Sequence, residues 1–259
     1  MVREVVGERD PAQIKRLREA LESCLGQTVE LAIGDSYAAL LQSFSRGDVQ
    51  AAWLTPAMVV EASRRGKLSL VAGSLRRGSA DYHATLVVRA DSGITRIDQL
   101  ADRRAGWVDP WSAAGYLFPR KMLRDARIDP TTAFSKQRFY SSHPAVLAAL
   151  RDDEIDVCGT YLHHSGRLRE DDSADVNGLV PLETSDAIPS DALCLGPHVP
   201  ADEVERIERQ LVSDAAVELA ATLQAQGFVK RALVDYALVR TLLDEEWGRT
   251  SNEPTPTAT

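Results

Sequence analysis

The alternation of apolar and polar residues predicts short strands and helices that follow one another along the first third of the chain. Apolar residues recur at helical spacing between Ile14 and Leu25, and Gly26 is a typical helix end. Strands are predicted at residues 3–7, 28–33, 49–54 and 68–72, and helices at 10–25, 37–44 and 55–64. Regular alternation of this kind implies a largely parallel sheet with right-handed crossovers.

The second part of the chain repeats the alternation after one long strand, Tyr82–Arg89, which we interpret as the first crossing between two lobes. A second crossing is expected within 180–195. Further strands are predicted at 105–108, 138–140 and 155–160, and helices after Ser112 and at 145–150, 202–226 and 234–247. We therefore predict one lobe from residues 1–88 and 190–247, a second from 89–189, and a disordered tail at 248–259.

Composition narrows the class of protein. The 259 residues, 44% hydrophobic and 26% charged, suit a soluble globular chain. A net charge of −8 argues against a nucleic-acid partner, which needs a basic patch, but not against a small anionic ligand held by local donors. No apolar run is long enough to span a membrane, and the first residues lack the apolar segment of a signal peptide. We therefore expect a cytoplasmic location for the chain as written, or a periplasmic or extracellular one for a mature form.

Cysteine and histidine give no sign of a metal or a cofactor. The three cysteines show no C-x-x-C spacing and are predicted to be buried, reduced thiols. The pair His163-His164 has no carboxylate or cysteine at ligand spacing, so a surface loop is expected there rather than a metal site. We expect neither a metal nor a cofactor.

The stretch Trp107–Leu123, WVDPWSAAGYLFPRKML, carries the candidate chemistry. A short strand ends at Asp109-Pro110, and Ser112 is a good N-cap for the helix that follows. The N–H groups of Ala113 to Gly115 would then be free at a positive helix end, which favours an anion. The alternative is that Ser112 only caps a helix.

The residues DPWSAAGYLFP at 109–119 resemble the DPxSxSGYxxP signature of the phosphate/phosphite/phosphonate-binding family of ABC-transporter proteins, and the resemblance extends from about Val29 to Pro200. It implies an α/β, type II periplasmic-binding-protein fold whose two lobes hold the ligand in a cleft and are joined by two crossing strands. It also implies a solute-binding function with hinge closure on a small oxyanion such as a phosphonate. The expected partner is an ABC permease, and the expected state is a monomer.

The resemblance also implies a set of ligand-binding positions. Two tyrosines, a serine, a histidine and an acidic residue match the family's motif. The residues beside the serine, and Thr55 at another strand end followed by a helix, complete the set: Tyr37, Thr55, Tyr82, Trp111, Ser112, Ala113, Ala114, Gly115, Tyr116, His143 and Asp191. Two departures stand out, because Ala113 and Ala114 occupy positions where the family has hydroxyl residues. Their loss predicts weak phosphonate binding and room for a bulkier or less charged group, covered by Trp111 and Tyr116.

Several alternatives stay open. Tyr37 and Tyr82 suit half-buried packing positions, His143 suits a helix start, and Asp191 suits a turn. An enzyme on the same fold and a cytosolic sensing domain that reports to a signalling partner are the rival functions. The sequence shows no nucleophile–base pair, metal constellation or cofactor fingerprint, which favours a binding protein over an enzyme.

Overall fold

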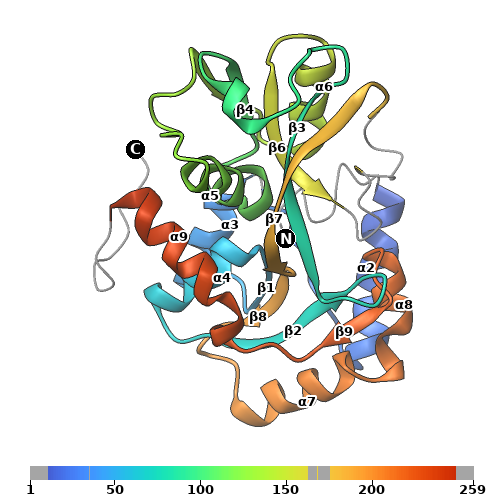
Figure 1. Ribbon diagram of the computed structural model, residues 1–259. Coiled ribbons are helices and arrows are strands. Elements are labelled where there is room, and N and C mark those ends of the chain that lie inside the picture. Colours follow the sequence, from blue (N-terminus) through green and yellow to red (C-terminus); the bar gives the residue numbers. More distant parts are fainter. Residues whose placement is uncertain (1–10, 35, 163–167, 169–175, 249–259) are drawn as a thin grey trace. The chain divides into compact units, whose positions relative to one another are not determined.

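A computed structural model describes residues 11–34, 36–162, 168 and 176–248 (Figure 1). The predicted strand at 3–7, the His163-His164 loop and the tail beyond residue 248 lie outside these residues. The chain forms two compact units, residues 1–81 with 189–259 and residues 82–188. The sequence predicts the boundaries between the two lobes at residues 88/89 and 189/190. Strand β3 (Asp81–Arg89) falls in the second unit because it pairs with β6 (Val157–Leu162) of that unit.

The first unit contains a four-stranded sheet in the order β1-β8-β2-β9. Its strands are β1 (Ala51–Leu54), β2 (Ser69–Leu75), β8 (Ala192–Leu195) and β9 (Gly227–Val229). Each neighbouring pair is antiparallel, so the predicted parallel arrangement is wrong for this sheet. The reason is that β8, which returns late in the chain, lies between β1 and β2 and separates them.

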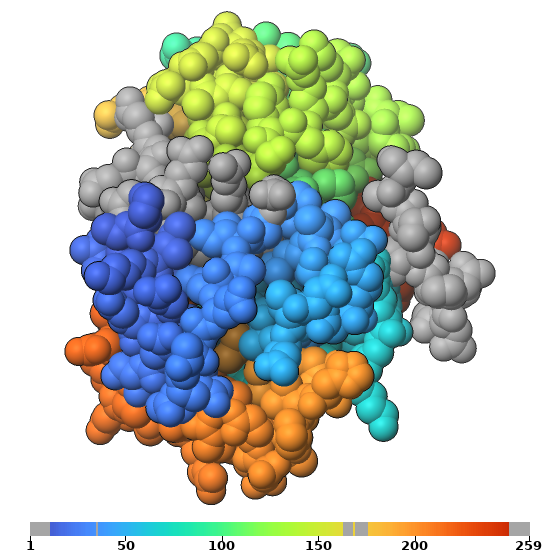
Figure 2. Space-filling view, turned by 180° about the vertical axis from the view of Figure 1, so that it is seen from behind, coloured from blue at the N-terminus to red at the C-terminus, as the bar shows by residue number. Residues whose placement is uncertain are grey.

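Helices pack on the sheet of the first unit. A large apolar cluster joins Trp53 and Leu193 of the sheet to α2 (Pro11–Leu25), α7 (Ala201–Leu211) and α8 (Val217–Thr222). Helices α2 and α7 contact each other, and the blue and orange regions that contain them adjoin in Figure 2. Helices α3 (Tyr37–Arg46) and α9 (Ala237–Trp247) each contact α4 (Pro56–Arg65), and α4 contacts β1 and β8.

One local prediction for the first unit is wrong. Residues 28–33 form no strand, because the Val29 N–H donates to the Glu22 carboxylate, at 3.0 Å, and Val29 packs on the apolar cluster. The helical region predicted at 202–226 consists of α7, the 3-10 turn η3 (Asp214–Ala216) and α8, and Ser213 caps η3. The last predicted helix likewise begins as a 3-10 turn, η4 (Leu233–Tyr236).

The second unit contains a five-stranded sheet in the order β5-β4-β6-β3-β7. Strand β4 (Arg104–Trp107) is parallel to both β5 (Lys136–Phe139) and β6, as the sequence predicts, whereas β3 is antiparallel to β6. The edge strand β7 (Leu179–Pro189) is the return crossing. Helix α6 (His143–Arg151) covers one face of the sheet, and α5 (Phe118–Asp125) covers the other.

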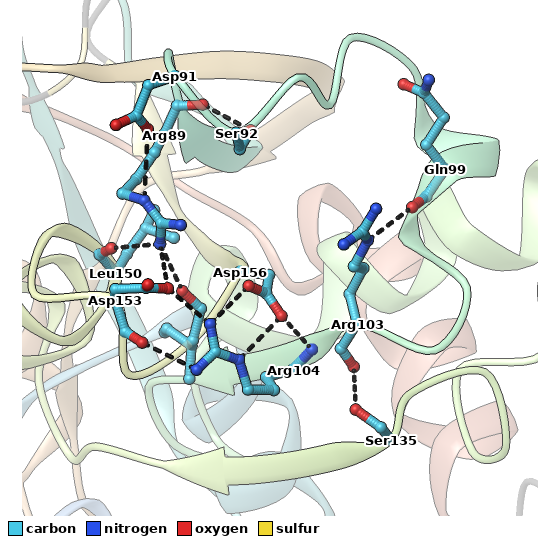
Figure 3. Close-up of polar contacts among 11 residues, drawn as sticks. Arg89, Asp91, Ser92, Gln99, Arg103, Arg104, Ser135, Leu150, Asp153 and Asp156 are labelled. Atoms are coloured by element: carbon cyan, nitrogen blue, oxygen red, sulfur yellow. Dashed lines mark hydrogen bonds and ion pairs between the residues drawn. The ribbon is translucent and has the colours of Figure 1, made fainter.

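An ion-pair cluster ties together the amino ends of the parallel strands (Figure 3). The Arg104 guanidinium contacts Asp156 at 2.7 Å and Asp153 at 2.6 Å, and Asp153 also contacts Arg89 at 3.0 Å. The hydrogen bonds from Arg104 lower the pKa of Asp156. Because this edge is occupied by structural ion pairs, the opposite, carboxyl edge of the sheet is the expected place for a ligand. In the part of the chain that the structure describes, no helix is long and apolar enough to cross a membrane.

Candidate functional site

The candidate oxyanion turn follows the carboxyl end of β4. After Ser112 the chain enters a short π-helix, η2 (Ala113–Leu117), whose first bond runs from the Leu117 N–H to the Ser112 carbonyl at 3.2 Å. The Ser112 hydroxyl accepts from the Gly115 N–H at 3.0 Å, so the prediction that the Gly115 N–H is free is wrong. The N–H groups of Ala113 and Ala114 precede the first i→i+5 bond, so the helix itself gives them no acceptor. Among the described residues neither group has an acceptor, so both are candidate donors to an anion.

Short-range hydrogen bonds hold this turn. The Asp109 carboxylate accepts from the Trp111 N–H at 2.8 Å, and the Asp109 carbonyl accepts from the Ser112 N–H at 2.9 Å. Burial raises the pKa of Asp109, and the bond from Trp111 opposes that shift. The Gly115 carbonyl also accepts from the Val108 N–H, at 3.2 Å. The turn is therefore preorganised, since its donors keep their directions without a ligand.

A glycine is required at position 115 for close packing. A Cβ atom there would lie 2.4 Å from Cγ2 of Val108, and 2.8 Å from the Ser112 hydroxyl oxygen. Any side chain at this position would push the helix start away from the end of β4.

His143 is the first residue of α6, after the N-cap Ser142. Its Nδ1 lies 2.8 Å from the Thr160 hydroxyl, and its ring is 4.8 Å from that of Tyr161 in an edge-on arrangement. The Tyr161 ring also contacts the Tyr82 ring edge-on, with centroids 6.4 Å apart. His143 is nearly fully buried, so its ring is held by these neighbours.

Strand β6 contacts each of these elements of the second unit. Its Gly159 contacts Gly115 of the oxyanion turn, Thr160 contacts His143, and Tyr161 contacts both His143 and Tyr82. The turn and His143 therefore contact successive residues of β6, whose side-chain positions point to opposite faces of the sheet. Tyr161 was missed in the sequence. The available signal was an aromatic residue at the end of a buried strand, GTYL.

Tyr116 is engaged in packing within the second unit. Its ring centroid is 6.0 Å from that of Trp107 and 5.2 Å from that of Phe139, and the Arg120 guanidinium lies 5.0 Å from it. Trp111, at the turn, is partly exposed. These contacts give Tyr116 a structural role in the second unit, and its predicted contact with a ligand stays a prediction.

The other predicted residues belong to the first unit. Tyr37 begins α3 and is buried, and Thr55 caps α4, its hydroxyl 3.5 Å from the Met58 N–H. Asp191 lies between β7 and β8, where burial raises its pKa to about 6 against the opposing effect of Arg76. That these three residues share a site with the turn of the second unit stays a prediction.

The chain crosses twice between two α/β units, and the second unit has a preorganised helix start at the carboxyl edge of its sheet. These features are typical of substrate-binding proteins. The family model for the periplasmic substrate-binding protein of phosphonate ABC transporters matches residues 8–236. The chain therefore belongs to this family, which consists of binding proteins and not enzymes. The family is periplasmic.

Solved structures show the same fold. A binding-protein component of an ABC phosphonate transporter from Pseudomonas aeruginosa is 20% identical, with a TM-score of 0.76 over 92% of this chain and 83% of that one. PhnD1 from Prochlorococcus marinus, in complex with methylphosphonate, is 14% identical, with a TM-score of 0.77 over 92% of each chain. A Xanthomonas citri protein bound to ATP is 17% identical, with a TM-score of 0.72 over 89% of this chain and 91% of that one. The predicted type II periplasmic-binding-protein fold is confirmed.

Proposed function

We propose that this protein binds a small oxyanion of the phosphonate class at the turn that begins with Ser112 and delivers it to an ABC permease. The observation that carries the proposal is the pair of N–H groups of Ala113 and Ala114 at the start of η2, beside a serine whose hydroxyl already fixes the turn. Backbone donors and the helix dipole favour a negative charge at such a position.

We further propose that the first unit completes the site through Tyr37, Thr55 and Asp191, and that the ligand is enclosed by hinge motion at the two crossings. The chain passes from one unit to the other at residues 81/82 and 188/189, which are the natural pivots for such a motion.

The side chains of the turn indicate a ligand that relies little on hydroxyl donors. Ala113 and Ala114 contribute only methyl groups, and a hydrogen bond to a charged group contributes about 1.5–3 kcal/mol. Phosphate and small alkylphosphonates should therefore bind weakly, and a bulkier or less charged oxyanion should bind better. The neighbouring rings of Tyr82 and Tyr161 offer it an apolar surface. The same fold holds larger oxyanions in other proteins, namely ATP in the Xanthomonas citri protein and MOPS in an alkanesulfonate-binding protein from Xanthomonas axonopodis.

The test is calorimetric titration of the purified protein with phosphate, phosphite, methylphosphonate and 2-aminoethylphosphonate. The same titrations are made on the double variant Ala113→Thr/Ala114→Ser, which restores two hydroxyls. We expect weak binding by the natural protein and at least tenfold tighter binding by the variant. Tight binding by the natural protein would show that the hydroxyls are dispensable, and binding by neither form would contradict the oxyanion site.

A further inference from the structure

A buried hydrogen bond joins β6 to the first residue of α6. The Thr160 hydroxyl lies 2.8 Å from Nδ1 of His143. Thr160 is 1% exposed and His143 is 7% exposed, so bulk water does not compete for this bond. The distance does not say which group donates, because a hydroxyl and an imidazole nitrogen can each take either role. The direction of the bond follows from where the hydroxyl proton of Thr160 can go.

The hydroxyl proton of Thr160 has one acceptor in the part of the chain that the structure describes, and that acceptor is Nδ1 of His143. The paired residue of β3, Thr85, shows the usual alternative, because its hydroxyl donates to the Glu183 carbonyl at 2.7 Å. A buried hydroxyl that donates to nothing is unfavourable. This accounting makes the Thr160 hydroxyl the donor and Nδ1 the acceptor.

The start of α6 favours the same assignment. His143 is the first residue of this helix, after the N-cap Ser142. The N–H groups at a helix start carry a positive potential, which disfavours a positive charge on the imidazole. An imidazolium would also carry a proton on Nδ1, so Nδ1 could no longer accept from the Thr160 hydroxyl. Both arguments favour a neutral ring whose one proton is on Nε2.

The position of this proton matters because α6 begins at the same strand end as the oxyanion turn. The Ser141 N–H donates to the Val108 carbonyl at 2.8 Å, and the Val108 N–H donates to the Gly115 carbonyl of the turn at 3.2 Å. A neutral imidazole has one donor and one acceptor nitrogen. A fully ionised oxyanion only accepts hydrogen bonds, so it is attracted by a protonated Nε2 and repelled by the lone pair of an unprotonated one.

We propose that Thr160 is a positioning residue of the oxyanion site: its hydroxyl donates to Nδ1 of His143 and thereby keeps the ring proton on Nε2, where it serves the ligand. Thr160 acts through His143 and needs no contact with the ligand. His143 is itself a predicted ligand-binding residue, and the inference adds the residue that sets its proton. The effect on the ligand rests on the proposed function, whereas the tautomer is independent of it.

The tautomer is measured on the ligand-free protein at neutral pH. Long-range proton–nitrogen NMR spectra of protein labelled with ¹⁵N-histidine distinguish protonated from unprotonated ring nitrogens, and His143→Gln identifies the signals of His143. We expect a protonated Nε2 and a hydrogen-bonded, unprotonated Nδ1 in the natural protein and in Thr160→Ser, which keeps the hydroxyl. In Thr160→Val the Nδ1 signal should move to that of a nitrogen without a hydrogen bond. A proton on Nδ1 of the natural protein, in a neutral or a charged ring, would overturn the proposal.

The effect on binding is measured by calorimetric titration with methylphosphonate, in the natural background and in Ala113→Thr/Ala114→Ser, where binding should be tighter. Thr160→Val should weaken binding about tenfold, and Thr160→Ser should preserve it. Thr85→Val is the matched control, because it removes an equally buried hydroxyl from the paired position of β3 and leaves His143 untouched.

The affinities separate the possible results. Equal affinities of Thr160→Val and Thr85→Val would overturn the positioning role, even with the proton on Nε2. No binding in either background would overturn the proposed function and the positioning role with it, whereas the spectra would still decide the tautomer of His143.

Discussion

Gly159 of β6 lies directly against the backbone of Gly115 in the oxyanion turn. A Cβ atom on Gly159 would be 3.0 Å from the carbonyl oxygen of Gly115 and 3.1 Å from its carbonyl carbon. The turn that presents the Ala113 and Ala114 N–H groups is thus seated on the sheet by backbone-to-backbone contact. Its position depends on the absence of a side chain at a residue that itself donates nothing to a ligand.

Gly159→Ala should therefore disturb both stability and binding. The added methyl group would also lie 2.6 Å from Cγ of Pro119. The Gly115 backbone, its other close neighbour, cannot move aside without moving the turn. We expect a loss of about 1–3 kcal/mol in the free energy of unfolding, measured by chemical denaturation, and weaker binding of methylphosphonate. Gly227→Ala is the control, because a Cβ atom there meets nothing within 4 Å. A Gly159→Ala variant as stable as this control would contradict the close seating.

Ser112→Ala should weaken the start of η2. The Ser112 hydroxyl accepts from the Gly115 N–H, and loss of an N-cap of this kind costs about 0.5–2 kcal/mol of stability. Ligand affinity should fall as well, since the turn loses its fixed shape. The comparison is Ser213→Ala, which removes the cap of η3 in the first unit. Equal losses of stability with an unchanged ligand affinity in both variants would show that Ser112 is a cap and nothing more.

Most strands and helices of the second unit could be predicted from the sequence, because the signals that define them are local. Apolar strands, the Asp109-Pro110 stop and the Ser112 cap are each set within a few residues, and the parallel strands β4, β5 and β6 follow from them. The π-helical form of η2 was not predicted. Gly115 within this element packs tightly against Val108, a contact that no local pattern reveals.

The first unit was harder to predict because its sheet is assembled from distant segments. Strand β8 pairs with both β1 and β2, and no local pattern in residues 49–72 reveals that a later strand separates them. The candidate site shows the same limit. The motif names His143 and Ser112 as candidates, and their role in a site stays a prediction. Tyr161 is linked to them by the contact of its ring with that of His143, a contact that the motif does not contain.

Asp156→Asn should reduce stability without affecting binding. The pKa of Asp156 is lowered chiefly by its hydrogen bond to Arg104, so its charged form stabilises the folded state. This contribution is present above the unfolded pKa of about 4 and is lost as the pH falls through the folded value. At pH 7 we expect the substitution to cost about 1–2 kcal/mol in chemical denaturation, because the pair is partly exposed. The difference from the natural protein should shrink below about pH 4, and an unchanged stability at pH 7 would contradict a stabilising role for the cluster in Figure 3.

Asp191→Asn should have the opposite effect on stability. Burial raises the pKa of Asp191 to about 6, above the value of about 4 expected in the unfolded chain. The folded state therefore binds more protons than the unfolded state between these values, and the stability of the natural protein falls as the pH rises from about 4 to about 6. The two-unit difference corresponds to about 2–3 kcal/mol. Asp191→Asn cannot lose a proton, so it should be more stable than the natural protein at pH 7 and should lack this part of the pH dependence. Denaturation of both proteins at pH 4, 5, 6 and 7 without ligand measures the effect, and parallel pH curves would show that the carboxyl group of Asp191 titrates at its ordinary value.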